Sequence, residues 1–220
     1  MSENKKISVA VIKRLPKYYR YLGDLLDKGI LKISSEELSK KMNTTASQVR
    51  QDLNNFGTFG QQGYGYNVEN LYKEIKKILG LVRDYRMIII GAGNIGQAIL
   101  SHSNFSTRGF YFDAIFDIDP LLIGKELNGI KVFDIFCLKE YMKGNRVDIV
   151  VLTVPNSSVI KIVNLLENSE IKGIWNFTGI DLPISEPIVV ENARLTDSLM
   201  TLSYRMNEDN IMEWAGIKSK

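Results

Sequence analysis

Three glycines near the middle of the chain have the type and spacing that can bind a phosphate group. The segment Gly91-Ala92-Gly93-Asn94-Ile95-Gly96 follows the apolar run 87–90 and leads into a helical pattern that starts at Gln97. A strand, a glycine turn and a helix start leave backbone N–H groups unpaired at the positive end of the helix dipole, where an anion is stabilised. We expect the glycines to permit, in order, the tight turn, the close approach of a pyrophosphate and the close packing of helix on strand.

A carboxylate lies at a suitable distance along the chain to bind the ribose of a nucleotide whose phosphates bind at the glycine turn. Asp117 follows the next apolar run, 110–116, and comes 21 residues after Gly96. A carboxylate at this position accepts hydrogen bonds from an adenosine ribose and repels a 2′-phosphate. The sequence therefore predicts an adenine dinucleotide site, and the alternative is a tight strand–helix turn that binds no ligand.

The charge distribution predicts two domains with different partners. The chain has 220 residues, of which 45% are hydrophobic and 24% charged, as in ordinary soluble domains. Residues 1–86 carry 16 Lys and Arg against 9 Asp and Glu, whereas residues 87–220 carry 12 against 16. A basic N-terminal third on a mildly acidic remainder is typical of a head that binds a polyanion.

Several classes of protein are disfavoured by what the sequence lacks. No apolar run approaches the roughly 20 residues of a membrane span, and the start of the chain is polar, so we expect a cytoplasmic protein. A single cysteine and a single histidine predict neither an internal disulfide nor a metal site. Cys137 lies among apolar residues, and this context predicts a buried structural thiol.

The N-terminal third has the pattern of a helix-turn-helix. Apolar residues recur at helical spacing in 7–28, and Gly29 follows. Ser34 and Glu37 have capping-box spacing, which Thr45 and Gln48 repeat at the start of the next helical pattern. Two short capped helices with a tight turn between them predict a helix-turn-helix.

The second of these short helices presents polar residues that can hydrogen-bond DNA bases. If Val49, Leu53 and Phe56 face the core, its opposite face carries Ser47, Gln48, Arg50, Gln51 and Asn54. Gln and Asn can pair with adenine, Arg with guanine or phosphate, and Ser with either. The alternative is a solvated face on a small helical bundle.

A glycine-rich segment follows, and it predicts the wing of a winged helix. Residues 57–66 place glycines among aromatic residues, which is typical of a β-hairpin whose tip, with Gln62 and Tyr64, can contact DNA. The alternative is a hairpin that only covers the core. An amphipathic helix over 68–82 then joins a DNA-binding domain of residues 1–85 to a second domain of residues 86–220.

Strands and helices alternate in the second domain, which predicts a Rossmann-type, doubly wound parallel sheet. The carboxyl ends of the strands should gather the glycine turn, Asp117, Thr153-Val154-Pro155 and Asn176-Phe177-Thr178-Gly179 around one crevice. His102 should lie about two turns into the first helix of this domain. We find no catalytic triad, carboxylate pair or Tyr-x-x-x-Lys-like donor, so we do not expect an enzyme. The expected strands are 88–90, 110–116, 130–132, 149–154, 173–177 and 188–190.

Short motifs run through nearly the whole chain: Arg14-Leu15-Pro16-Lys17-Tyr18-Tyr19-Arg20-Tyr21-Leu22, Val49-Arg50-Gln51-Asp52-Leu53, Phe56-Gly57, Gly63-Tyr64-Gly65-Tyr66-Asn67-Val68, the glycine turn, Phe116-Asp117-Ile118-Asp119-Pro120, Thr153-Val154-Pro155, Lys172-Gly173-Ile174-Trp175-Asn176-Phe177 and Thr201-Leu202-Ser203-Tyr204. In type and order they resemble the Rex family of redox-sensing transcriptional repressors. The resemblance implies a homodimer with a winged helix and a Rossmann domain, whose last helix is swapped into the partner. It implies that the dimer binds a palindromic operator at a low NADH/NAD⁺ ratio and that NADH releases the DNA. Residues 196–204 are the candidate swapped helix, and the alternative is a helix packed on its own subunit.

The chain departs from the family pattern at positions that the resemblance assigns to sensing. Arg194 and Leu195 stand where family members usually have an acid and an aromatic residue, so Arg20 would face a like charge instead of a partner. His102 replaces a tyrosine. We therefore keep open the alternative that the chain is a divergent paralogue, which responds to another adenine nucleotide or discriminates weakly between NADH and NAD⁺.

Glutamines also replace basic residues that are common in the DNA-reading parts of the family. Gln51 and Gln62 are the two positions, and each lost phosphate contact should weaken DNA binding and reduce its salt dependence. Two rival classes also remain, an NAD-dependent oxidoreductase and a module that binds CoA or an adenine nucleotide.

Overall fold

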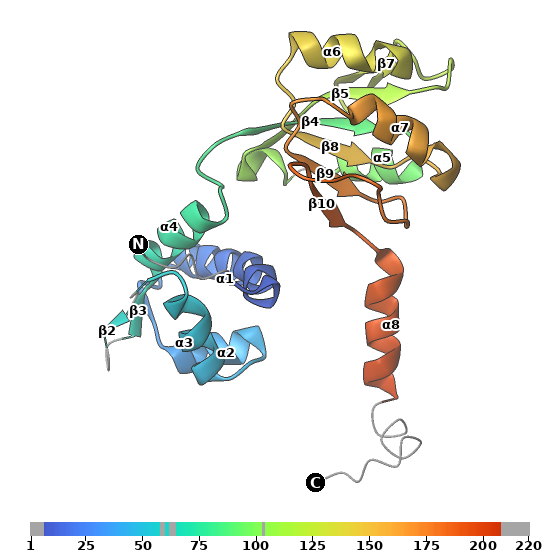
Figure 1. Cartoon of the computed structure of the whole chain (residues 1–220). Coiled ribbons are helices and arrows are strands. Elements are labelled where there is room, and N and C mark those ends of the chain that lie inside the picture. The colour runs from blue at the N-terminus through green and yellow to red at the C-terminus, as the bar shows by residue number, and fades with distance from the viewer. Residues whose placement is uncertain (1–6, 58–59, 62–64, 103, 208–220) are drawn as a thin grey trace. The chain divides into compact units, whose positions relative to one another are not determined.

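A computed structural model describes residues 7–57, 60–61, 65–102 and 104–207 (Figure 1). The chain divides into two compact units, Met1–Arg83 and Asp84–Lys220, which are described separately. The division falls next to the boundary expected from the sequence.

The first unit combines helices with a small antiparallel sheet whose strand order is β1-β3-β2. Its winged helix-turn-helix arrangement is confirmed, with α2 and α3 as the two short helices and β2 and β3 as the strands of the wing. Strand β1, which pairs with β3, was not expected from the sequence. The elements are α1 (Val9–Asp27), β1 (Lys32–Ile33), α2 (Ser35–Met42), α3 (Ala46–Asn54), β2 (Gly60–Gln61), β3 (Gly65–Asn67) and α4 (Val68–Ile78).

Local hydrogen bonds explain where these helices begin and end. Ser34 and Glu37 form the complete expected capping box at α2. Gly29, with φ of 71°, closes α1 in a left-handed turn in which the N–H of Ile30 donates to the Leu25 carbonyl. Gly80, with φ of 73°, closes α4 in the same way, so the expected helix over 68–82 is too long and Val82 lies outside it, exposed.

The second unit is the doubly wound sheet that the sequence predicts, with strand order β10-β9-β8-β4-β5-β7-β6. Every neighbouring pair is parallel except β6 and β7. The elements are β4 (Tyr85–Ile90), α5 (Asn94–Leu100), η1 (Ser106–Arg108), β5 (Phe110–Asp117), β6 (Glu126–Leu127), β7 (Ile130–Asp134), η2 (Ile135–Cys137), α6 (Leu138–Gly144), β8 (Ile149–Leu152), η3 (Asn156–Ser158), α7 (Val159–Leu166), β9 (Gly173–Asn176), β10 (Val189–Asn192) and α8 (Leu195–Met206).

The chain reverses its direction of winding between β4 and β8, and this determines where a ligand can bind. Ile88 and Ile90 of β4 pack with α6 and α7 on one face, whereas Met87 and Ile89 pack with α5 on the other. Helix α5 follows β4, whereas α6 leads into β8 and α7 follows it (Figure 1). A crevice forms at such a switch point, at the carboxyl ends of the strands.

Two expectations about single residues were wrong. Helix α5 ends at Leu100, so His102 lies just beyond the helix, because Ser101, His102 and Asn104 have low helix propensity. Cys137 is exposed, not buried. In the turn η2 and the start of α6, only Ile135 and Leu138 of this apolar stretch reach the core, and Phe136 also faces solvent.

The described part of the chain lacks two kinds of feature. Its helices include none with the length and apolar composition required to cross a membrane. Its His, Cys, Asp and Glu side chains form no group that could hold a metal ion.

Candidate functional site

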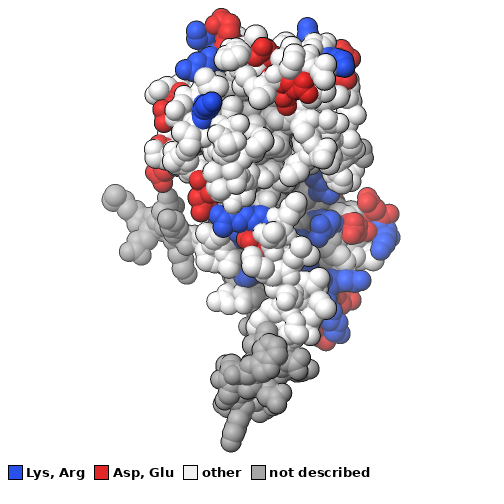
Figure 2. Space-filling model, turned by 90° about the vertical axis from the view of Figure 1, so that its right-hand side faces the viewer, with Lys and Arg blue, Asp and Glu red and all other residues white. Residues whose placement is uncertain are grey.

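A cavity of about 590 Å³ lies at the carboxyl ends of the strands, where β4 and β8 adjoin. Most of the residues that the sequence assigned to nucleotide binding line it together. Figure 2 shows the molecule from the side to which these strand ends point. Much of the middle of that surface is white, because few Lys, Arg, Asp or Glu side chains lie there. The predicted residues in its wall are Gly91, Gly93, Asn94, Ile95, Asp117, Ile118, Thr153, Val154, Pro155, Phe177 and Thr178.

A different structural reason explains the glycine at each of the three positions of the turn. Gly91 has φ of 104°, and a Cβ there would lie 2.9 Å from the Thr153 carbonyl oxygen. A Cβ on Gly96 would overlap the Gly91 carbonyl oxygen, so this glycine lets α5 approach the turn. Gly93 has an ordinary φ of −70°, and a Cβ there would meet only open space. The surface at Gly93 is therefore open to a ligand.

Polar contacts hold the turn from two sides, from Asp117 at the end of β5 and from Thr153 after β8. The N–H of Ala92 donates to Asp117 Oδ2 at 2.5 Å, and Asp117 Oδ1 accepts from the N–H groups of Ile118 and Asp119. Thr153, which follows β8, donates its hydroxyl to the Gly91 carbonyl at 2.7 Å. The carboxylate of Asp117 is thus held beside the glycine turn at the end of β5.

Two further residues support the segments that line this cavity. Gln97 was not singled out from the sequence, whereas Asn176 was expected at this crevice. Gln97 Nε2 donates to the Ala92 carbonyl at 2.7 Å and braces the turn from within α5. Asn176 is buried at the end of β9, and its Oδ1 accepts from both the N–H and the hydroxyl of Thr178.

The three predicted sensing residues of the second unit do not line the cavity. His102 is exposed, and its ring meets that of Phe105 edge-on at 5.5 Å between centroids. Arg20 is exposed on α1 of the first unit. Arg194 forms an ion pair with Asp181, 2.5 Å between Nη2 and Oδ1, and Leu195 is exposed at the start of α8. Arg194 therefore has an acidic partner within its own unit.

Helix α3 exposes most of the predicted base-reading residues. Ser47, Arg50, Gln51 and Asn54 are exposed, and Arg50 Nη1 donates to the Ser35 hydroxyl at 2.9 Å. Gln62 and Tyr64 of the expected wing lie outside the described residues.

Gln48 differs from the other residues of this face because its side chain turns inward. Its N–H donates to the Thr45 hydroxyl, but its Nε2 donates to Asp52 Oδ1 at 2.8 Å. The reciprocal half of the expected capping box is therefore replaced by a contact to Asp52. A base-reading role for Gln48 would require this contact to open.

Asp52 is fully buried in the first unit, and three side chains solvate its carboxylate. Arg14 of α1 donates Nε at 2.6 Å and Nη2 at 2.7 Å, Tyr18 donates its hydroxyl at 3.0 Å, and Gln48 donates from within α3. Burial acts to raise the pKa of Asp52, but these hydrogen bonds outweigh it and the pKa lies below its ordinary value. Burial and the neighbouring carboxylate raise the pKa of Tyr18.

A winged helix-turn-helix unit and a doubly wound sheet with a glycine-turn cavity define a class of protein in which a DNA-binding domain is joined to a Rossmann-type domain. Comparison with family models agrees with both parts. Residues 6–54 match "Putative DNA-binding protein N-terminus", and residues 82–180 match "CoA binding domain".

Similarity to characterised relatives extends over nearly the whole chain. The chain is 53% identical over 208 residues to the redox-sensing transcriptional repressor Rex of Clostridioides difficile (strain 630), covering 94% of this chain and 99% of the relative. The Rex repressor of Clostridium tetani (strain Massachusetts / E88) is 52% identical over the same shares. The chain belongs to the Rex family of redox-sensing transcriptional repressors.

Solved structures of this family share the fold. The crystal structure of RSP in complex with beta-NAD⁺ and operator DNA has a TM-score of 0.89 and 47% identity, covering 99% of this chain and all of that one. RSP in complex with beta-NADH has a TM-score of 0.87 and 45% identity, covering 96% of this chain and all of that one.

Proposed function

We propose that this chain is a cytoplasmic transcriptional repressor that binds operator DNA as a homodimer and responds to the NADH/NAD⁺ balance through the cavity of its second unit. The observation that carries the proposal is the presence, in one Rex-family chain, of an exposed polar face on α3 and a glycine-turn cavity with Asp117 at its edge. RSP, at 45–47% identity, forms complexes with beta-NAD⁺, beta-NADH and operator DNA, which supports the same ligands here.

The residues around the cavity suit an adenine dinucleotide. The open surface at Gly93 and the N–H groups that follow it would accept the pyrophosphate. Asp117 would accept hydrogen bonds from the adenosine ribose. Ile118 and Val154 supply apolar surface, while Phe177 and Thr178 line the remainder of the cavity. Asp117 is the one titratable side chain among the described residues of its wall, so a regulatory role fits better than acid–base catalysis.

Operator DNA would be read from α3. Arg50, Gln51, Asn54 and Ser47 are exposed there and have the hydrogen-bonding groups for base edges and phosphates. Gln48 would not contact the DNA in this arrangement, because its side chain is bound to Asp52 on the inner side of α3.

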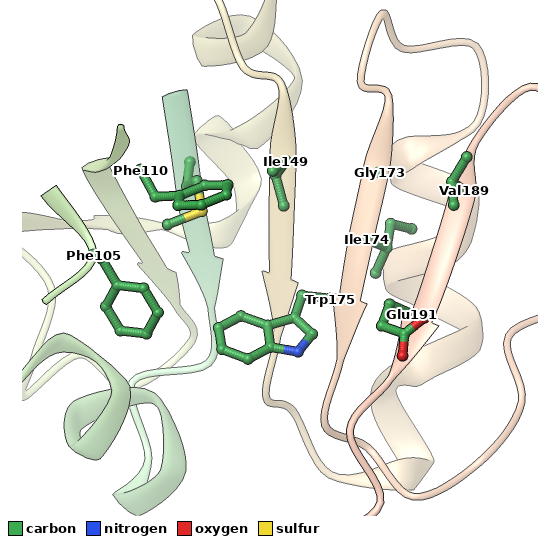
Figure 3. A pocket seen from close by; sticks show the side chains of 9 residues that line it. Phe105, Phe110, Ile149, Gly173, Ile174, Trp175, Val189 and Glu191 are labelled. Carbon is green, nitrogen blue, oxygen red and sulfur yellow. The ribbon is translucent and has the colours of Figure 1, made fainter. Parts of the chain in front are cut away.

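The second unit leaves two apolar surfaces without a cover, which supports a homodimer. None of the residues of α8 is buried, and Leu199, Leu202 and Met206 form an exposed stripe along it. An apolar cavity of about 350 Å³ lies on the sheet, with Phe105 and Phe110 on one side, Val189 and Glu191 on the other, and Trp175 and Ile149 between them (Figure 3). Because parallel sheets are normally covered on both faces, we propose that α8 of a second copy covers this surface.

A second candidate is the same repressor with weakened discrimination between NADH and NAD⁺. Arg194 is paired with Asp181, and His102 lies against Phe105. Two residues at the expected sensing positions are thus engaged with other neighbours, and this favours a response in which both nucleotides act alike.

Competition among nucleotides tests the assignment of the cavity against its rivals. We expect NADH to bind the full chain about tenfold or more tightly than NADPH, because Asp117 repels the 2′-phosphate. CoA should not compete with NADH. Asp117→Asn should reduce the difference in affinity between NADH and NADPH. Asp119→Asn is the matched control and should keep that difference. CoA binding that equals NADH binding would contradict the proposal and favour the CoA-binding module.

A further inference from the structure

A buried asparagine connects the wall of the nucleotide cavity to the segment that leads into α8. Asn176 is 2% exposed, and both ends of its amide are used. Its Oδ1 accepts from the N–H of Thr178 at 3.0 Å and from the Thr178 hydroxyl at 2.7 Å. Its Nδ2 donates to the Ile180 carbonyl at 2.8 Å and to Asn192 Oδ1 at 2.7 Å. Thr178 itself lines the cavity.

The chain of hydrogen bonds continues to the residue that precedes α8. Asn192 Nδ2 donates to Asp181 Oδ1 at 3.2 Å, and the same oxygen accepts from Arg194 Nη2. Arg194 is the N-cap residue of α8. Five side chains thus form an unbroken polar path from the cavity to α8: Thr178, Asn176, Asn192, Asp181 and Arg194.

The backbone reinforces this path. Asn176 lies opposite Asn192 in the parallel register of β9 and β10, and the N–H of Ala193 donates to the Asn176 carbonyl at 2.8 Å. Asn176 therefore holds the loop 177–181 with its side chain and the segment before α8 with both side chain and backbone. A network that only stabilised the edge of the sheet would not need a member that faces the cavity.

We propose that Asn176 is a positioning residue that couples the occupant of the cavity to α8, through Asn192 and the Asp181–Arg194 ion pair. The inference rests on the proposed function, because it assumes that a nucleotide binds in the cavity and that α8 contributes to the dimer.

The coupling follows from the hydroxyl of Thr178, which has a single proton to donate. A ligand acceptor at Thr178 competes with Asn176 Oδ1 for that proton. Because Asn176 is buried, its amide moves to keep its remaining partners, and the shift reaches Asn192 and Asp181. The contact that holds Arg194 changes, and with it the orientation of the first turn of α8. A ligand without an acceptor at Thr178 leaves these hydrogen bonds unchanged. A nucleotide that has such an acceptor and one that lacks it would therefore differ in their effect on the orientation of α8.

Asp181→Asn tests the proposal, because it removes the charge that holds Arg194 and lies outside the wall of the cavity. The matched control is Glu140→Gln, which removes an exposed ion pair with Lys143 on α6. We expect the Asp181 variant to bind NADH as the wild type does. The factor by which NADH changes operator affinity should fall about threefold or more, while the control keeps it.

An unchanged factor in Asp181→Asn, beside a normal wild-type response, would overturn the inference alone. No effect of NADH on the wild type would instead contradict the proposed function, and the inference with it. The two failures are therefore distinguishable.

A second pair of variants tests the other end of the path. Thr178→Ser keeps the hydroxyl and Thr178→Val removes it. Hydrogen–deuterium exchange of residues 193–206, with and without saturating NADH, should show a NADH-dependent difference in the wild type and the serine variant and lose it in the valine variant. The same NADH-dependent difference in all three proteins would overturn the proposal.

Discussion

Asp52 is the buried charge that fixes α3 against α1. Its carboxylate is bound by Arg14, Tyr18 and Gln48 at 2.6–3.0 Å, so the helix that would read DNA is held by a residue on its inner face. A buried carboxylate costs stability when a partner is lost, because the remaining charges are left without compensation.

Asp52→Asn should destabilise the first unit by about 2 kcal/mol at pH 7, since it removes charge-assisted hydrogen bonds. The pKa of Asp52 lies below its ordinary value, so its stabilisation is complete above the unfolded-state pKa of about 3.9 and is lost as the pH falls through the folded-state pKa. Urea unfolding should therefore show a difference between variant and wild type that shrinks below about pH 4. Asp24→Asn, at an exposed carboxylate of α1, is the control. A difference that stays constant from pH 7 to pH 3 would count against this account.

The glycines of the turn should separate stability from ligand binding. Gly96→Ala should cost about 2 kcal/mol, because its Cβ would overlap the Gly91 carbonyl. Gly93→Ala meets open space and should leave the free energy of unfolding unchanged, but weaken NADH binding about tenfold. Thermal unfolding and a fluorescence titration with NADH measure the two effects. Wild-type affinity in Gly93→Ala would show that the pyrophosphate does not approach this glycine.

The sequence predicted two kinds of cavity residue: those that are neighbours in the chain, and those that follow the carboxyl ends of parallel strands. The glycine turn, Asp117 and Thr153 meet because the carboxyl ends of neighbouring strands share one edge. The partners of Gln48 and Arg194 could not be found in this way. Asp52 lies on the side of α3 that was assigned to the core, and Asp181 is 13 residues from Arg194 in a loop without a motif.

At the scale of elements, α3 carries the prediction about DNA. Arg50→Ala should weaken binding to a palindromic duplex selected in vitro and, if Arg50 contacts phosphate, reduce the salt slope by about 1. Lys161→Ala, an exposed cation on α7, should leave both unchanged. Equal, salt-insensitive binding by Arg50→Ala and the wild type would exclude α3 as the reading element.

Helix α8 carries the prediction about assembly. Leu199 is 64% exposed and lies on the apolar stripe, so Leu199→Glu should convert the dimer to a monomer in light scattering coupled to gel filtration. Thr201→Glu, on another side of α8, adds the same charge and should remain dimeric. Dimers in both variants would mean that the stripe lies outside the interface.

Most elements were predictable because hydrophobic periodicity determines them, as in the six parallel strands. Their ends were less predictable where a single residue decides. Gly80 ends α4 before the apolar pattern ends, and α5 stops at Leu100 although the expected helix continued past His102. Strand β1 has only two residues, which is too short for an alternating pattern to show.

In the whole molecule, a response to NADH requires that the second unit controls what the first unit binds. Within the second unit the structure offers a path from the cavity to α8, and α8 is the element proposed to join two copies. A dimer presents two α3 helices to two half-sites, so a change in its geometry changes operator affinity.

The measurement that tests this most directly is the dissociation constant for a selected palindromic operator, determined with saturating NADH and with saturating NAD⁺ at one salt concentration. We expect NADH to raise this dissociation constant about tenfold or more relative to NAD⁺. Equal constants with the two nucleotides, although both bind, would contradict redox sensing and favour the repressor with weakened discrimination.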